Sequence, residues 1–168
     1  EVVKRRVDGE PIPYIMGTKG FYDLEFAVTP AVLIPRPETE LLLEDALRLM
    51  QDKPNCQVAD IGTGSGALAV TFAKPSPQSH VYATDVSEPA LAVATSNAHK
   101  NQADVQFMLG NLAQPLIDNN IKVACLMANL PYIPYDEMLM LAVSKHEPTL
   151  ALDGGQDGLD LIRDLLKQ

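Results

Sequence analysis

Short apolar runs alternate with longer, helix-like segments from residue 58 onward. Four runs have the length and β-branched content of buried strands, at 58–61, 81–85, 105–109 and 123–128. An alanine-rich segment up to about Lys74 follows the first run, and Ser87 with Pro89 suits the start of a helix that reaches about Lys100. Strands that alternate with helices predict an α/β fold with a parallel sheet and right-handed crossovers.

The first part of the chain has a different texture. Prolines and glycines interrupt short apolar runs between Gly9 and Pro37 without a helical period, and residues 21–28 are typical of a β-hairpin. Pro35-Arg36-Pro37 predicts a stiff, extended link. We therefore expect an interdomain segment with a β-hairpin over residues 1–37 and a catalytic domain over 38–168.

A helix is expected to follow the link from about Glu38, with acidic residues in its first turn. Its apolar face is predicted to consist of Leu41, Leu42, Ala46, Leu49 and Met50.

The predicted sheet has few strands for a doubly wound fold. After Leu150 the sequence predicts only a glycine-rich turn and one helix over 159–166. We expect the domain to be incomplete at its C-terminal end, with one edge of the sheet lacking its last strands.

Charge and composition narrow the classes of function. The chain has 168 residues and a net charge of −9, whereas binding to nucleic acid requires Lys and Arg against phosphates. Its one basic cluster, Lys4-Arg5-Arg6, is short. No apolar stretch approaches the ~20 residues of a membrane span, and the first ten residues are polar. A cytoplasmic enzyme without nucleic-acid or membrane partners is expected. The sequence predicts no oligomeric state.

Cysteines and histidines give no sign of a metal site. Cys56 and Cys125 lie in apolar runs, and the three histidines are scattered without ligand spacing. We expect free thiols and no bound metal.

A glycine-rich loop, Gly62-Thr63-Gly64-Ser65-Gly66, lies between the first strand and the helix that follows it. Glycines let the backbone approach a ligand closely, and a helix start offers free N–H groups. Asp85 ends the next strand, where a carboxylate can accept hydrogen bonds from both ribose hydroxyls. The loop predicts an adenosine-containing cofactor, and the same spacing also fits a nicotinamide dinucleotide.

The segment that distinguishes between these kinds of cofactor is Asn129-Leu130-Pro131-Tyr132, which directly follows the fourth strand. It resembles the Asn-Pro-Pro-Tyr motif of methyltransferases that modify nitrogens conjugated to a π system. Such a nitrogen is a poor nucleophile, so the enzyme must supply geometry. The side-chain oxygen of Asn129 and the carbonyl of residue 130 can each accept one N–H of the target, while Tyr132 packs on its planar group.

Two residues depart from the usual motifs. Leu130 stands where a proline is usual, which removes a fixed φ but keeps the carbonyl acceptor. Asn111, next to Leu112, stands where an aspartate usually meets the adenine amino group, and its oxygen can still accept without the help of a charge.

Together these residues resemble the release factor glutamine methyltransferases, the HemK family, over almost the whole chain. The resemblance extends to Leu33-Ile34-Pro35-Arg36-Pro37-Glu38-Thr39-Glu40, to Glu147-Pro148 and to the glycines at 154, 155 and 158. It implies a Rossmann-like domain that uses S-adenosylmethionine, preceded by a hairpin linker and by a helical domain that recruits a peptide chain release factor. We expect this chain to be a fragment that lacks most of that helical domain. The substrate implied is the glutamine of the Gly-Gly-Gln loop of that factor.

The resemblance also assigns site residues. Gly62–Gly66 would line the methionine part of the cofactor, Asp85 its ribose, and Asn111 with Leu112 its adenine, while Asn129–Tyr132 would hold the glutamine amide.

Four alternatives remain open. They are a ribosomal-protein glutamine methyltransferase, a nucleic-acid amine methyltransferase, a cofactor-binding fragment without catalysis, and a nicotinamide oxidoreductase.

Overall fold

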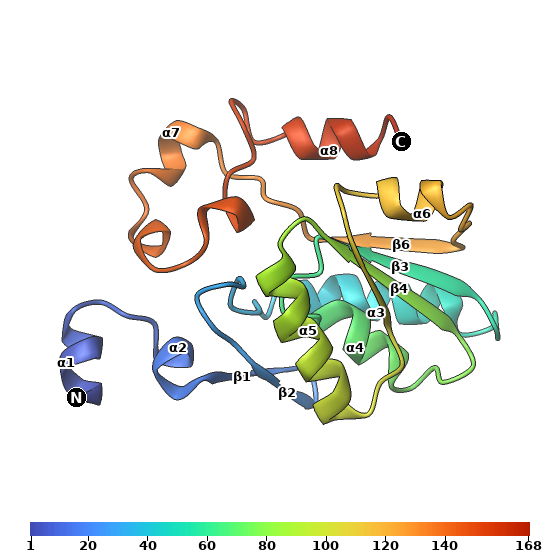
Figure 1. Cartoon of the computed structure of the whole chain (residues 1–168), viewed down its shortest axis with the longest axis horizontal. Coiled ribbons are helices and arrows are strands. Elements are labelled where there is room, and N and C mark those ends of the chain that lie inside the picture. The colour runs from blue at the N-terminus through green and yellow to red at the C-terminus, as the bar shows by residue number, and fades with distance from the viewer.

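A four-stranded parallel sheet forms the centre of the molecule (Figure 1). The computed structural model describes the backbone of residues 1–168 and every side chain other than those of Ala142 and Val143. The strands lie in the order β5–β4–β3–β6, and their bounds are β3 (Gln57–Ile61), β4 (His80–Asp85), β5 (Gln106–Leu109) and β6 (Cys125–Ala128). The predicted α/β fold with a Rossmann-like parallel sheet is confirmed.

Helices cover both faces of the sheet. Figure 1 shows α3 (Thr39–Met50), α4 (Ala67–Ala73) and α5 (Glu88–Asn101) on one side, and α6 (Gln114–Asp118) and α8 (Asp160–Leu165) on the other. All seven residues of α4 are buried. Small alanine side chains let this helix pack closely against the sheet and against α3 and α5.

The start of α5 follows its predicted signals. The Ser87 hydroxyl accepts a hydrogen bond from the backbone nitrogen of Ala90 at 3.3 Å, and Pro89 lies in the first turn. The side chain of Ser87 thus satisfies one of the free N–H groups at the helix start.

The apolar face of α3 is partly different from the one expected. Leu43, Ala46 and Met50 are buried, whereas Leu41 and Leu49 are 66% and 59% exposed. The prediction was wrong for the last two. Leu41 is two positions before Leu43, about 200° around the helix, so the side that meets α4 and β6 excludes it.

Residues 1–37 contain a hairpin, as predicted, in which β1 (Thr18–Phe21) pairs antiparallel with β2 (Leu24–Ala27). They also contain two short helices, α1 (Val2–Val7) and α2 (Ile12–Met16), and α2 lies in the stretch between Gly9 and Pro37 where no helical period was expected. A five-residue helix is too short to reveal a period. The division of the chain at residue 37 stays a prediction.

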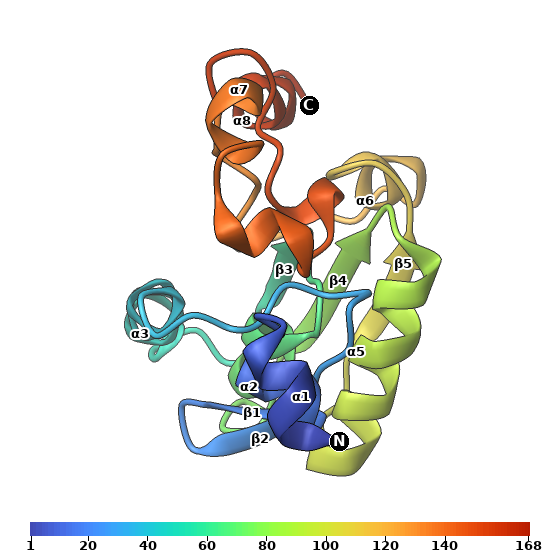
Figure 2. The same cartoon turned by 90° about the vertical axis from the view of Figure 1, so that its left-hand side faces the viewer.

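The C-terminal part lies over the carboxyl edge of the sheet. Figure 2 shows the strands pointing toward the segment that carries α7 (Tyr135–Met138) and two 3-10 helices, Ala142–Lys145 and Thr149–Ala151. A parallel bridge between Ile133 and Asp153 closes this segment into a loop. Every helix in residues 1–168 is too short or too polar to cross a membrane.

Candidate active site

The strand register brings the predicted site residues to one edge of the sheet. Ile61 at the end of β3 pairs with Thr84 of β4 and with Ala128 of β6, and Asp85 pairs with Leu109 of β5. The strand order reverses between β3 and β6, because the chain crosses from β5 back past both central strands. A doubly wound sheet binds its ligands in the crevice at such a point.

A cavity of about 270 Å³ lies at this edge. Most of the predicted site residues line it, namely Gly62, Thr63, Gly64, Ser65, Asp85, Asn111, Leu112, Asn129, Leu130 and Pro131. Gly66 and Tyr132 do not line it. The link before α3 closes the cavity from the other side with Val32, Leu33, Pro35 and Arg36.

The glycine-rich loop turns sharply into α4. The backbone nitrogens of Gly62 and Thr63 both donate to the carbonyl of Thr84, at 2.9 and 3.0 Å, which fixes the loop to β4. Gly64 has a φ of 55°, and no atom lies within 4 Å of the place where a Cβ would stand. Its backbone therefore faces the open cavity, where a ligand can approach it.

Gly66 acts through packing rather than through the cavity. Its φ is 82°, and a Cβ at this position would lie 3.2 Å from the Cβ of Ala94. A glycine here lets the start of α4 come close to α5 and keeps the loop in its conformation.

Asp85 is held in a fixed orientation by the backbone. Its Oδ2 accepts from the nitrogen of Gly64 at 2.8 Å, and its Oδ1 accepts from the nitrogen of Ser87 at 2.9 Å. Each oxygen keeps further acceptor capacity. The carboxylate can therefore accept two adjacent hydroxyl groups of a ligand in the cavity.

A second carboxylate, Asp60, lies beneath the loop and was not predicted as a site residue. It is 1% exposed, and its Oδ2 accepts from the Thr63 hydroxyl at 2.6 Å and from the nitrogen of Ala69 at 3.2 Å. Burial raises the pKa of Asp60 to about 6, and the charge of Asp85 adds to the rise while the two hydrogen bonds oppose it. Its position two residues before Gly62 was the signal available in the sequence.

The adenine side of the predicted site follows β5. The carbonyl of Leu112 accepts from the Thr84 hydroxyl at 2.7 Å, and Leu112 itself is buried with a φ of 50°. Asn111 is exposed at the mouth of the cavity. An apolar side chain and an amide thus lie side by side. This pair suits a flat ring of a ligand that carries hydrogen-bonding groups at its edge.

A second cavity of about 280 Å³ adjoins the first. Asn129, Leu130 and Pro131 line both, so this segment forms part of the wall between them, together with Leu33, Arg36, Thr39 and Ala151. Tyr132 is 65% exposed and lines only the second cavity. Asn129, Leu130 and Pro131 are thus placed where a group in one cavity meets a group in the other, and Tyr132 faces the second cavity alone.

Leu130 has a packing role that its sequence position did not reveal. It is buried, and its Cδ2 lies 3.2 Å from the place where a Cβ on Gly62 would stand. The leucine side chain therefore packs over the first glycine of the loop. It joins the two motifs in one apolar cluster with Ile61 and Leu112.

The glycines at 154 and 158 support the backbone of Tyr132. A Cβ on Gly154 would lie 2.8 Å from the Cα of Tyr132, and a Cβ on Gly158 would overlap its carbonyl oxygen. The nitrogen of Gly154 also donates to the carbonyl of Ile133 at 2.9 Å. These positions admit only glycine as long as Tyr132 keeps its place.

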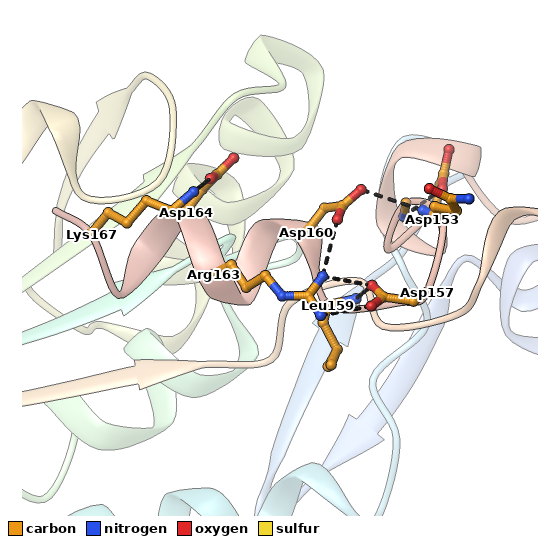
Figure 3. Close-up of polar contacts among 9 residues, drawn as sticks. Asp153, Asp157, Leu159, Asp160, Arg163, Asp164 and Lys167 are labelled. Carbon is orange, nitrogen blue, oxygen red and sulfur yellow. Dashed lines mark hydrogen bonds and ion pairs between the residues drawn. The ribbon is translucent and has the colours of Figure 1, made fainter.

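Acidic side chains hold this glycine-rich segment in turn (Figure 3). Asp153 Oδ1 accepts from the nitrogen of Gly155 at 2.9 Å, and Asp160 Oδ2 accepts from the nitrogen of Gln156 at 3.3 Å. Arg163 pairs with Asp157 at 2.6 Å between Nη2 and Oδ2. The network orders the turn that precedes α8.

Among the described side chains, no group of three or more His, Cys, Asp or Glu residues could hold a metal ion. Cys56 and Cys125 are free thiols, buried and half-buried respectively.

Comparison with protein families finds a match to a methyltransferase family. The model of the methyltransferase small domain family matches residues 37–137, which include the glycine-rich loop, Asp85 and Asn129–Tyr132.

Curated relatives carry the name expected from the resemblance. The chain is 44% identical to the release factor glutamine methyltransferase of Moorella thermoacetica over 99% of its own length, and 39% identical to that of Bacillus anthracis over 100%. It covers 59% and 61% of those two relatives, so the chain spans about three fifths of their length.

Solved structures share the fold. A T. thermophilus 16S rRNA methyltransferase in complex with AdoMet and guanosine aligns with a TM-score of 0.57 at 18% identity, covering 68% of this chain and 32% of its own. TrmN from Thermus thermophilus aligns with a TM-score of 0.51 at 27% identity, covering 76% of this chain and 34% of its own.

Proposed function

The chain belongs to the methyltransferase small domain family, and from this premise we propose that it methylates the side-chain amide nitrogen of a glutamine in a protein. The methyl donor proposed is S-adenosylmethionine, and the substrate proposed is the Gly-Gly-Gln loop of a peptide chain release factor. The observation that carries the proposal is the place of Asn129–Pro131 between two adjoining cavities. The names of the relatives support the choice of glutamine.

The residues around the first cavity fit the cofactor. Gly64 leaves open space over its backbone for the methionine part, and the Asp85 carboxylate can accept both ribose hydroxyls. Leu112 offers an apolar surface to the adenine, and the Asn111 oxygen an acceptor for its amino group. When bound, S-adenosylmethionine supplies a methyl group on a positively charged sulfur.

Asn129 and Leu130 orient the target. The Oδ1 of Asn129 and the carbonyl of Leu130 each accept one N–H of the glutamine amide, which holds its nitrogen at the wall between the cavities. Tyr132 lies along the second cavity, packs on the planar amide and excludes water from it.

No side chain has to act as a general base. The acidity of the amide nitrogen rises sharply once it carries the methyl group, so the proton passes to solvent afterwards. The acceptors on Asn129 and Leu130 also favour the positive charge that spreads onto the nitrogen during transfer.

The closest rival substrate is a glutamine of a ribosomal protein, which the same two cavities would accept. The net charge of −9 disfavours the alternative of a nucleic-acid amine. A release factor as partner places the proposed reaction in the cytoplasm.

The cofactor is tested by calorimetric titration of the chain with S-adenosylhomocysteine and, separately, with NAD. Saturable binding of the first alone supports the proposal. Binding of NAD alone would assign the cavity to a nicotinamide cofactor, and binding of neither would contradict the proposed site.

The substrate is tested by parallel assays with a release factor, a ribosomal protein and an adenine-containing oligonucleotide. Methylation of the release factor alone supports the substrate proposed here. Preference for either of the others would replace it.

A further inference from the structure

Thr39, the first residue of α3, touches the central residue of the proposed site. The Nδ2 of Asn129 donates to the hydroxyl of Thr39 at 3.2 Å, across a sequence separation of 90 residues. Both residues line both cavities. The contact therefore lies at the wall where the two cavities meet.

The hydroxyl of Thr39 is not occupied in forming its own helix. Polar side chains at the start of a helix commonly accept from its free N–H groups, but α3 has no side-chain hydrogen bond of this kind. Its turn is closed by backbone bonds, such as that from the nitrogen of Thr39 to the carbonyl of Arg36 at 3.1 Å. The hydroxyl is directed to Asn129 instead.

In this contact the Asn129 nitrogen faces Thr39, and the Asn129 oxygen is the atom presented to a substrate. A side-chain amide has one oxygen acceptor and one nitrogen that only donates. With the nitrogen held by Thr39, the acceptor Oδ1 is left for a ligand, and no described side chain donates to it. If the Asn129 amide were turned the other way, its N–H groups would face the N–H groups of the target, and no hydrogen bond could form between them.

The position of Thr39 is itself fixed from the far side of the site. Glu147 is buried and accepts from the backbone nitrogen of Ile34 at 3.2 Å and from Arg36 Nη2 at 2.6 Å. These bonds anchor the link that runs into α3. The hydroxyl is thus held by a framework that does not depend on Asn129.

We propose that Thr39 is a positioning residue, whose hydroxyl holds the Asn129 amide with its oxygen toward the target nitrogen. The inference rests on the proposed function, because it concerns the same amide substrate. It separates two tasks of the chain: Asn129 accepts from the substrate, and Thr39 sets the orientation in which it can do so.

The test compares Thr39→Val with Thr39→Ser. Valine keeps the branched shape but removes the hydroxyl, and serine keeps the hydroxyl. We expect Thr39→Val to lower kcat on a Gly-Gly-Gln substrate by about 10- to 100-fold, with affinity for S-adenosylhomocysteine and Tm unchanged. Thr39→Ser should recover most of kcat. Thr95→Val, which removes an exposed hydroxyl on α5, is the matched control and should leave kcat unchanged.

Two outcomes would overturn the positioning role. A Thr39→Val chain with wild-type kcat, beside an Asn129→Ala chain that has lost turnover, would leave the proposed function standing and remove the role of Thr39. A Thr39→Val chain that loses cofactor affinity or Tm in proportion to kcat would make the residue structural.

A measurement without turnover separates the inference from the proposed function. The side-chain amide protons of Asn129 can be followed by NMR in the unchanged chain and in the Thr39→Val chain. Slower solvent exchange of one proton in the unchanged chain alone supports the contact, even if every glutamine substrate fails. Equal exchange in both chains would refute it.

Discussion

The carboxylate of Glu147 and the guanidinium of Arg36 form an ion pair of 2.6 Å, although 111 residues separate them. The Glu147 side chain is 1% exposed, whereas Arg36 is partly open to solvent. The pair joins the link before α3 to the segment that follows Asn129. Two stretches that are distant in the sequence thereby close over one cavity.

Removing Glu147 should loosen this closure. In Glu147→Ala the buried nitrogen of Ile34 loses its acceptor, while Arg36 can still turn toward water. We expect the free energy of unfolding to fall by about 1–3 kcal/mol in urea titrations followed by circular dichroism. The exposed ion pair of Asp45 and Arg48 gives the control. Asp45→Ala should change the free energy of unfolding by less than about 0.5 kcal/mol. Equal losses in both variants would contradict the role of the buried pair.

Gly66→Ala should disturb the proposed cofactor site more than the same change at Gly17 does. Both glycines have a left-handed φ, 82° and 76°, so both variants bear a backbone cost of about 1 kcal/mol. Only at Gly66 does the new Cβ meet Ala94, whereas nothing lies within 4 Å at Gly17. Calorimetry should show weaker binding of S-adenosylhomocysteine in Gly66→Ala and unchanged binding in Gly17→Ala. Unchanged binding in both would refute the packing argument.

Asp85→Asn should lower cofactor affinity without unfolding the chain. The new Nδ2 cannot accept from a ribose hydroxyl, and where it replaces Oδ2 it faces the N–H of Gly64. We expect affinity for S-adenosylhomocysteine to fall by about 10- to 100-fold in calorimetric titration. Asp104→Asn, an exposed change away from the cavity, is the control. If the two variants bind equally well, Asp85 does not hold the ribose.

Asp60 should make stability depend on pH. Its pKa in the folded state, about 6, lies above the usual 3.8, so the folded chain binds the proton more tightly than the unfolded chain does. The contribution of Asp60 to the free energy of unfolding is therefore greatest below pH 4 and is lost as the pH rises through 6. For a pKa shift of this size, the loss is roughly 3 kcal/mol.

Asp60→Asn should flatten this dependence. Both hydrogen bonds go to one oxygen, Oδ2, which the asparagine can retain. Urea unfolding at pH values from 4 to 7 should show a smaller decline in the variant than in the unchanged chain. An identical decline in the two chains would show that Asp60 does not titrate in this range.

The sequence predicted the strands and the place of the glycine-rich loop at the carboxyl edge of the sheet, because both depend on local patterns. Ser87 and Pro89 begin α5 as expected, and the loop at Gly62–Gly66 follows its strand directly. The inward face of α3 was predicted less well. Leu41 and Leu43 are equally apolar, and only the place of α4 and β6 decides which of them is buried.

The contacts that close the site could not be predicted from local patterns. Thr39 and Glu147 stand in recognisable motifs, but a motif does not show that Thr39 meets Asn129 or that Glu147 meets Arg36. These contacts depend on how the link and the C-terminal segment fold over the carboxyl edge of the sheet. The packing of Leu130 over Gly62 likewise follows from the parallel pairing of β3 with β6.

The central claim is that Asn129 holds a glutamine amide for methylation. It is tested most directly by incubating the unchanged chain and Asn129→Ala with S-adenosylmethionine and a release-factor domain, and by locating the added methyl group by peptide mass spectrometry. We predict that the unchanged chain adds one methyl group to the glutamine of the Gly-Gly-Gln loop, and that Asn129→Ala adds none while binding S-adenosylhomocysteine within a few-fold of normal. Methylation of that glutamine at the normal rate by Asn129→Ala would contradict the claim.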